Sequence, residues 1–239
     1  KMIVDAKKSV LKEADGFGFA SLPIKKMSSN KSEGTNPTEI FVKLVINSTN
    51  ILDSHKDVHI PGIWDQSLKQ RGKNILHLQE HVRKFSHVIS RGDDLKAYVE
   101  TVTWKSLGFD LKGPTQILGF DSLVRQSQNK EMFEEYSKGN ITEHSVGMQY
   151  VKMLTCINDE DYPVQKENWD KYAPMIANTE ALEQTKVFWA VLEAKVIEGS
   201  AVLMGSNSFT PTRTTAPKEL TVDELKLEAI KSFLEKRAE

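Results

Sequence analysis

Histidines beside an acidic residue are the first side chains in this sequence that could carry chemistry. His77, Glu80 and His81 form the pattern HxxEH. On a helix, two histidines at this spacing can hold a zinc ion while the glutamate acts as a general base. The same segment, residues 75–81, fits a strand equally well, and histidines on a strand cannot clasp one metal in that way. Both interpretations stay open. If the segment is a strand, the two histidines are predicted to be structural.

A candidate nucleophile is Ser145, at the start of an apolar segment that reads as a strand. Gly147, two residues later, would let a substrate backbone approach closely. A serine hydroxyl is a poor nucleophile until a base takes its proton. The adjacent His144 points to the other face of a strand, so it is not automatically that base. The only cysteine, Cys156, follows an apolar strand and is predicted to be a buried structural thiol.

Two glutamates, Glu193 and Glu198, occur in the most apolar part of the chain. A carboxylate among buried strands needs a partner, because an unpaired buried charge costs several kcal/mol, and a histidine is one such partner. Each glutamate could instead end a strand and face water. They are five residues apart, and an odd number of residues places two side chains on opposite faces of a regular strand. A bend at Gly199 would change the direction in which Glu198 points.

The elements that must position these groups are mainly strands. Alternating or continuous apolar residues predict strands over residues 40–46, 95–104, 145–155 and 186–204, the last as two buried runs joined at a bend. Helices are predicted over residues 65–71 and 120–138. Strand and helix patterns do not alternate regularly. We therefore predict a mainly β fold with peripheral helices (α+β), as a barrel or curled sheet rather than a doubly wound sheet.

The composition divides the chain into three parts. Residues 1–38 are predicted to be an N-terminal extension and linker, and residues 39–212 a domain with an insertion at 156–185. Residues 213–239 are predicted to be a linker and a C-terminal helix, which starts with a capping box at Thr221 and Glu224. We expect this last part to be dispensable for the domain.

Charge and composition exclude several classes of protein. Lys and Arg number 32 against 33 Asp and Glu, so the net charge gives no case for nucleic acid or for an acidic membrane. A single cysteine excludes a disulfide framework and a multi-cysteine zinc site. No apolar run is long enough to span a bilayer. The chain starts at Lys1 without a signal-peptide pattern, and we expect it to begin inside a longer product.

Four segments, in order, resemble motifs of the prohead maturation proteases of tailed bacteriophages. Residues 53–68 resemble the family pattern D-x-x-x-D-x-[apolar]-x-P-G-[AI]-[FW], with His59 at its apolar position. The LQEH that ends at His81 matches L-x-x-H, and the SVGM that starts at Ser145 matches S-[IV]-G-[FM]. Residues 193–207 match both glutamates, the serine and the asparagine of E-x-x-L-x-E-V-S-L-V-x-x-P-A-N. The resemblance covers roughly residues 40–212.

This resemblance implies a serine protease with a fold similar to herpesvirus assemblin, a closed or nearly closed β-barrel ringed by helices. It implies Ser145 as the nucleophile, His81 as the general base and Glu198 as the third catalytic residue, with Glu193 in reserve. It implies no cofactor and no metal. The enzyme would work in the host cytoplasm, within the assembling prohead.

The substrates implied by the resemblance are the scaffold protein, extensions of the major capsid protein and the protease itself. Self-association is a further possibility, and neither nucleic acid nor a membrane is an expected partner. Two other functions stay open. One is a non-catalytic capsid- or scaffold-associated protein that keeps a protease-like fold. The other is a zinc peptidase through His77, Glu80 and His81.

Overall fold

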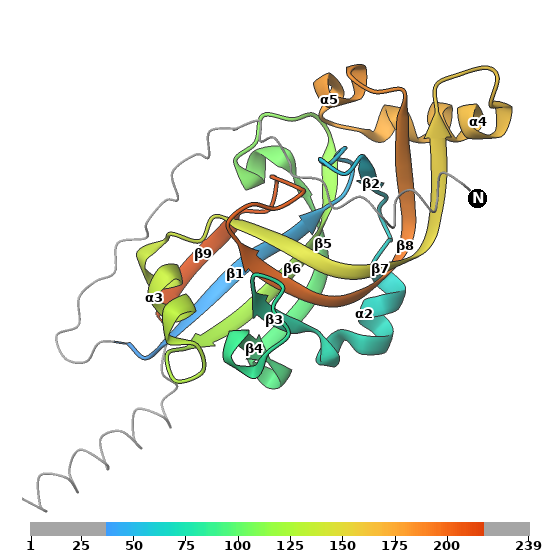
Figure 1. Cartoon of the computed structure of the whole chain (residues 1–239). Helices are drawn as coiled ribbons and strands as arrows, with labels where there is room; N and C mark the ends of the chain where they lie inside the picture. Colours follow the sequence, from blue (N-terminus) through green and yellow to red (C-terminus); the bar gives the residue numbers. More distant parts are fainter. Residues whose placement is uncertain (1–36, 218–239) are drawn as a thin grey trace, which may run out of the picture.

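Strands dominate the computed structural model, which describes residues 37–217, and they form two sheets (Figure 1). The first sheet is antiparallel, in the order β5 (Leu95–Thr103), β6 (Pro114–Arg125), β1 (Glu39–Ser48) and β9 (Thr212–Pro217). The second has the order β2 (Asp57–His59), β8 (Val187–Val202), β3 (Leu76–Gln79) and β4 (Val88–Arg91). The long strand β7 (Glu143–Ile157) pairs with β8 along its other edge.

Short helices surround the two sheets. They are α2 (Asp65–Arg71), α3 (Lys130–Lys138), α4 (Pro163–Tyr172) and α5 (Thr179–Glu183), with single 3-10 turns at Gly72–Asn74, Phe85–His87, Gly92–Asp94, Trp104–Leu107 and Ala173–Met175. The mainly β, α+β class predicted from the sequence is confirmed. The expected closed barrel is not found, because the strand pairs of residues 37–217 form two separate sheets rather than a closed ring.

The main core lies between the sheets. Alternate residues of β1 are fully buried and face it: Val42, Leu44 and Ile46. They pack with Phe120 of β6 and Val196 of β8. Each large apolar side chain buried in this way contributes about 1.5–3 kcal/mol to the stability of the fold. The core therefore holds β8, the strand that carries both glutamates, against β1.

The predicted helix over residues 120–138 is wrong in its first part. Phe120, Ser122 and Val124 are buried and their neighbours less so, which is the two-residue period of a strand. The helix begins only at Lys130, where the Asn129 side chain accepts a hydrogen bond from the amide of Met132. Pairing with β1 and β5 on both sides keeps the first half extended.

The two apolar runs predicted over residues 186–204 form one strand, β8, without a break at Gly199. A Cβ atom at Gly199 would lie 2.6 Å from Phe120 and 2.7 Å from Ile46. The missing side chain therefore lets two core residues pack directly against the strand. The glycine serves close packing and not the bend that the sequence suggested.

The predicted insertion forms a helical connection between β7 and β8. It contains α4 and α5, which lie at the far end of these two strands (Figure 1). A second core cluster fixes it, in which Trp169 and Tyr172 of α4 pack with Phe188 of β8 and Cys156 of β7. Because Cys156 still belongs to β7, the connection starts later than the predicted residue 156.

The predicted C-terminal linker also begins as a strand. Residues 212–217 form β9, which pairs with β1 from Ile40 to Leu44. The boundary expected after residue 212 therefore falls inside a sheet. The predicted N-terminal extension, up to residue 36, and the predicted C-terminal helix lie outside the described residues.

Candidate active site

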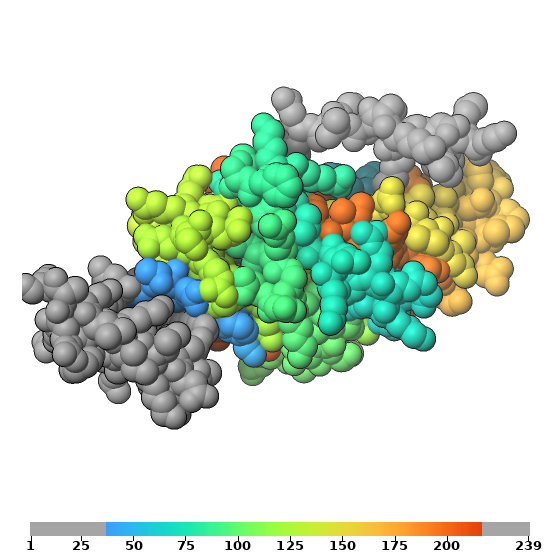
Figure 2. All heavy atoms as spheres, turned by 90° about the horizontal axis from the view of Figure 1, so that it is seen from below, coloured from blue at the N-terminus to red at the C-terminus, as the bar shows by residue number. Residues whose placement is uncertain are grey.

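Three neighbouring strands, β3, β8 and β7, carry the site residues suggested by the sequence. β8 lies in the middle, with β3 parallel to it on one side and β7 antiparallel on the other. Figure 2 shows the underside of the molecule, where β8 (orange) reaches the surface between the β3–β4 region (teal to green) and β7 (yellow). His81 follows β3, Glu198 lies on β8, and Ser145 lies on β7.

His81 and Glu198 form a direct hydrogen-bonded pair. The Nδ1 atom of His81 lies 2.7 Å from Oε1 of Glu198. The imidazole is 42% exposed whereas the carboxylate is 2% exposed, so a buried acid holds a ring that solvent or substrate can reach. The hydrogen bond that His81 donates to Glu198 raises the pKa of His81 above its usual value, although partial desolvation acts in the opposite direction. With Nδ1 donating to the carboxylate, Nε2 of the neutral ring is the proton acceptor.

Ser200 completes the support of this pair; the sequence pointed to it only as the serine of the motif over residues 193–207, with no role assigned. Its hydroxyl donates to Oε2 of Glu198 at 2.7 Å and accepts from the backbone amide of His81 at 3.1 Å. It is fully buried. The spacing from Glu198 to Ser200 is two residues, which places both side chains on one face of a strand. That spacing was the signal available in the sequence.

Ser145 lies on the same face of the sheet, directly opposite Ser200 in the β7–β8 ladder. Opposed side chains in an antiparallel pair have Cβ atoms about 4.5–5.5 Å apart. Ser145 is therefore next to the serine that binds Glu198. Its side chain is partly buried, and its hydroxyl makes no hydrogen bond to another of the residues that the structure describes. The structure thus brings Ser145, His81 and Glu198 to one face, without a direct bond between Ser145 and His81.

Gly147 makes room for the carboxylate. It lies opposite Glu198 in the ladder, and a Cβ atom on Gly147 would be only 1.7 Å from Oε1 of Glu198. Any larger residue would have to displace the carboxylate that holds His81. The sequence suggested a different reason for this glycine, the approach of a substrate backbone.

The turn that presents His81 has an unusual backbone. Glu80 and His81 both have positive φ, at 51° and 56°. The amide of Val82 donates to the carbonyl of Gln79 at 3.0 Å, so these four residues form a tight turn with two left-handed central residues. Such conformations cost of order 1–3 kcal/mol each for residues other than glycine.

Contacts from β8 and the segment after it stabilise this turn. The Glu80 amide donates to the carbonyl of Ala201, and the Glu80 carboxylate accepts from the amide of Leu203. The bonds of His81 to Ser200 and Glu198 add to these. The turn is therefore tied to the strand that carries the acid, which fixes where the imidazole lies.

His77 and His144 belong to a buried hydrogen-bond network in the core. The Tyr136 hydroxyl lies 3.1 Å from Nε2 of His77 and 3.0 Å from Nε2 of His144. Ser122 contacts the other nitrogen of His77, and the carbonyl of Thr210 accepts from Nδ1 of His144. Burial lowers the pKa of His77 well below its usual value and that of His144 to about 4. Both rings are neutral at pH 7.

These contacts argue against the zinc interpretation of the HxxEH pattern. Both ring nitrogens of His77 are bound to core hydroxyls, while His81 is bound to Glu198. Glu80 bonds the amide of Leu203 instead. The pattern forms a strand and a turn rather than a helix, and within residues 37–217 no three acidic, histidine or cysteine side chains gather as a metal site.

The two remaining candidates lie away from the site. Glu193 is opposite Lys152 in the ladder, five residues along β8 from the acid that binds His81. Cys156 is fully buried in the second core cluster, where desolvation raises the pKa of its thiol to about 12. It is a structural thiol, as predicted.

No protein-family model matches the chain, and neither a curated protein nor a solved structure shows significant similarity to it. Among the described residues, no helix is long and apolar enough to cross a membrane. The chemistry of the site must therefore be argued from its geometry.

Proposed function

We propose that this protein is a serine endopeptidase with Ser145 as nucleophile, His81 as general base and Glu198 as the acid that orients His81. The single observation that carries the proposal is the 2.7 Å bond between His81 Nδ1 and Glu198, on the face that also holds Ser145. A buried acid, a reachable imidazole and a nearby hydroxyl are the three groups that acyl transfer by serine requires.

The reaction follows from the protonation states of these groups. Nε2 of neutral His81 takes the proton of the Ser145 hydroxyl while Oγ attacks the carbonyl carbon of the scissile bond. The imidazolium then gives this proton to the departing amine, and the C–N bond breaks to leave an acyl-enzyme. Water attacks the ester with His81 again as the base, which releases the acid and restores Ser145. Catalytic hydrogen bonds often tighten only when substrate is bound, so the Ser145–His81 bond would form at that stage.

The biological setting of the proposal comes from the resemblance to phage prohead proteases. We propose that the substrates are scaffold protein, extensions of the major capsid protein and the chain itself, within the immature capsid in the host cytoplasm. The proposed catalytic residues follow one another along the chain as His81, Ser145 and Glu198, which is the order of the family motifs and supports this setting. We also propose that the fold is related to the assemblin barrel. The two sheets that pack on a common core support this relation.

A serine-directed probe tests the chemistry. The purified chain is treated with a fluorophosphonate, and the adduct is located by mass spectrometry together with any self-cleavage products. We expect the adduct on Ser145. In the Ser145→Ala and His81→Ala variants, we expect the rate of labelling or cleavage to fall by on the order of 10⁴-fold. Ser86→Ala is the matched control, because Ser86 is an exposed serine that also contacts a histidine ring, that of His87.

Two results would contradict the proposal. Labelling of Ser86 or Ser200 instead of Ser145 would mean that the nucleophile is wrong. No labelling of a folded chain, with no cleavage of itself or of scaffold and capsid proteins, would favour the non-catalytic capsid-associated protein. Circular dichroism of each variant separates loss of chemistry from loss of the fold.

A further inference from the structure

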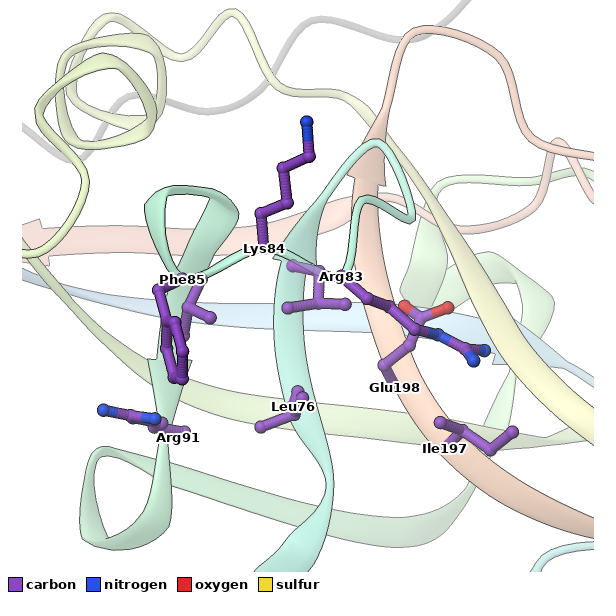
Figure 3. A pocket seen from close by; sticks show the side chains of 9 residues that line it. Leu76, Arg83, Lys84, Phe85, Arg91, Ile197 and Glu198 are labelled. Carbon is purple, nitrogen blue, oxygen red and sulfur yellow. The ribbon is translucent and has the colours of Figure 1, made fainter.

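A pocket of about 200 Å³ opens beside Glu198, over β3 and β4 (Figure 3). Its lining includes the apolar side chains of Leu76, Leu78 and Val88, from two paired strands, together with Phe85 and Ile197. The volume lies below the roughly 300–1,000 Å³ of sites that enclose a whole small molecule. The pocket therefore has the size and lining to hold one large apolar side chain.

Three cationic side chains also line this pocket: Arg83, Lys84 and Arg91. Among residues 37–217, none of the three forms an ion pair. The one acid in the lining, Glu198, is bound to His81 and Ser200 and does not balance them. The surroundings of the pocket are thus positively charged, although the chain as a whole has a net charge of -1.

An aromatic ring forms one wall of the pocket and is open to solvent. Phe85 is 82% exposed, and the guanidinium of Arg91 lies 5.8 Å from its ring centroid. Figure 3 shows Phe85 and Arg91 on one side of Leu76, with Arg83 and Glu198 on the other. A large apolar ring held at the surface beside an apolar pocket is typical of a surface that a ligand covers.

We infer that this pocket is a substrate subsite that takes a large apolar side chain whose neighbour in the peptide is acidic. The apolar floor recognises the first residue, and the cations around it recognise the carboxylate of the second. This inference rests on the proposed function, since it assigns part of the peptide substrate of the same site. Glu198, the acid bonded to His81, belongs to the lining, so the pocket lies beside the proposed catalytic groups.

Peptide binding and cleavage test the inference together. Fluorescein-labelled decapeptides carry Leu beside Glu, Leu beside Lys, or Ala beside Glu at their centre. Binding is measured by anisotropy on the Ser145→Ala variant, and cleavage is measured on the wild-type chain. We expect the Leu–Glu peptide to be preferred over each of the others by about tenfold or more in both measurements.

Two variants of the pocket separate the two parts of the recognition. Lys84→Glu with Arg91→Glu should reverse the charge preference, so that Leu–Lys becomes the better peptide. Leu76→Phe should fill the pocket and remove the preference for Leu over Ala. The control is Lys171→Glu, which also removes an exposed cation over an aromatic ring, that of Tyr172, but on α4. It should leave both preferences unchanged.

The outcomes distinguish this inference from the proposed function. If peptides are cleaved without either preference, or if the pocket variants leave the preferences unchanged, the subsite inference is overturned and the protease proposal stands. If the Ser145→Ala variant binds with the expected preferences but the wild type neither cleaves nor reacts with the fluorophosphonate, the subsite inference is supported and the protease proposal is overturned. If neither binding nor cleavage occurs, both are overturned.

Discussion

At the scale of single residues, the contact between His81 and Glu198 would set the pH at which His81 works as the proposed base. The ring must be neutral to accept a proton, and the carboxylate raises its pKa above the usual 6.5. We expect kcat/KM to rise with pH through a midpoint above 6.5. Glu198→Gln should move that midpoint to lower pH, because the charge that stabilises the imidazolium is lost, and should reduce the rate by roughly 10²–10⁴-fold.

A matched amide variant shows whether Glu198 is the correct acid. Glu193→Gln removes the other carboxylate of β8, which lies opposite Lys152 and away from His81. It should reduce the rate by less than about tenfold and leave the pH midpoint in place. Rate profiles of both variants under identical conditions check this. A shifted midpoint in Glu193→Gln with an unchanged one in Glu198→Gln would mean that the acid has been assigned wrongly.

Gly147 offers a test that leaves every proposed catalytic group in the chain. Gly147→Ala would put a Cβ atom where Oε1 of Glu198 now lies, so the carboxylate must move away from His81. We expect cleavage to fall by on the order of 10²-fold or more, as for other displaced catalytic groups. The pH midpoint should also fall toward that of Glu198→Gln.

The control for this substitution is Gly72→Ala, at the end of α2. Apart from its chain neighbours and the backbone of its own helix, no described residue has a heavy atom within 4 Å of a Cβ at Gly72, and its φ of -48° suits any residue. Activity and pH midpoint should both equal those of the wild type. Normal activity of Gly147→Ala would show that the bond between His81 and Glu198 is not needed.

At the scale of elements, the turn over residues 79–82 holds its histidine in a costly conformation. Glu80→Gly and Glu80→Ala both lose the bond from the amide of Leu203, but only glycine adopts the φ of 51° without strain. We expect the Gly variant to be more stable than the Ala variant by about 1 kcal/mol. Urea denaturation of the two variants measures the difference. Equal stabilities would mean that the positive φ costs nothing here.

At the scale of the whole molecule, the pairing of β9 with β1 places residues 212–217 inside the folded domain. Thr212 also donates through its hydroxyl to the carbonyl of Ile141. A chain that ends after Pro217 should keep the thermal transition of the full chain. A chain that ends after Pro211 should lose roughly 5–10 °C in Tm, because the edge of β1 is exposed and a strand is missing.

Calorimetry of the two truncated chains checks this boundary. The sequence alone predicted that everything after residue 212 was dispensable, since Thr and Pro residues there are typical of a linker. Equal transitions for both truncated chains would support that original prediction. Loss of the transition in the longer chain would mean that residues 218–239 also belong to the folded domain.

Much of the local structure could be predicted from the sequence. The two-residue period of β1 and the apolar runs of β7 and β8 identified these strands, and the irregular alternation of strand and helix patterns indicated the α+β class. The residues of the candidate site were also recognisable in part, because a serine, a histidine and an acid among apolar residues stand out by type. These are properties of residues and their near neighbours, and local backbone preferences and periodicity depend on little else.

The choice between alternatives depended on contacts between distant parts of the chain. Parallel pairing of β3 with β8 decided that HxxEH is a strand and a turn, and brought His81 to Glu198, which is 117 residues away in the chain. The register of β7 decided that Ser145 faces Ser200 and that Gly147 faces Glu198. A shift of one residue would turn all of these side chains to the other face. Register is set by how whole strands bury their apolar faces, so only the tertiary structure decided which carboxylate holds the histidine.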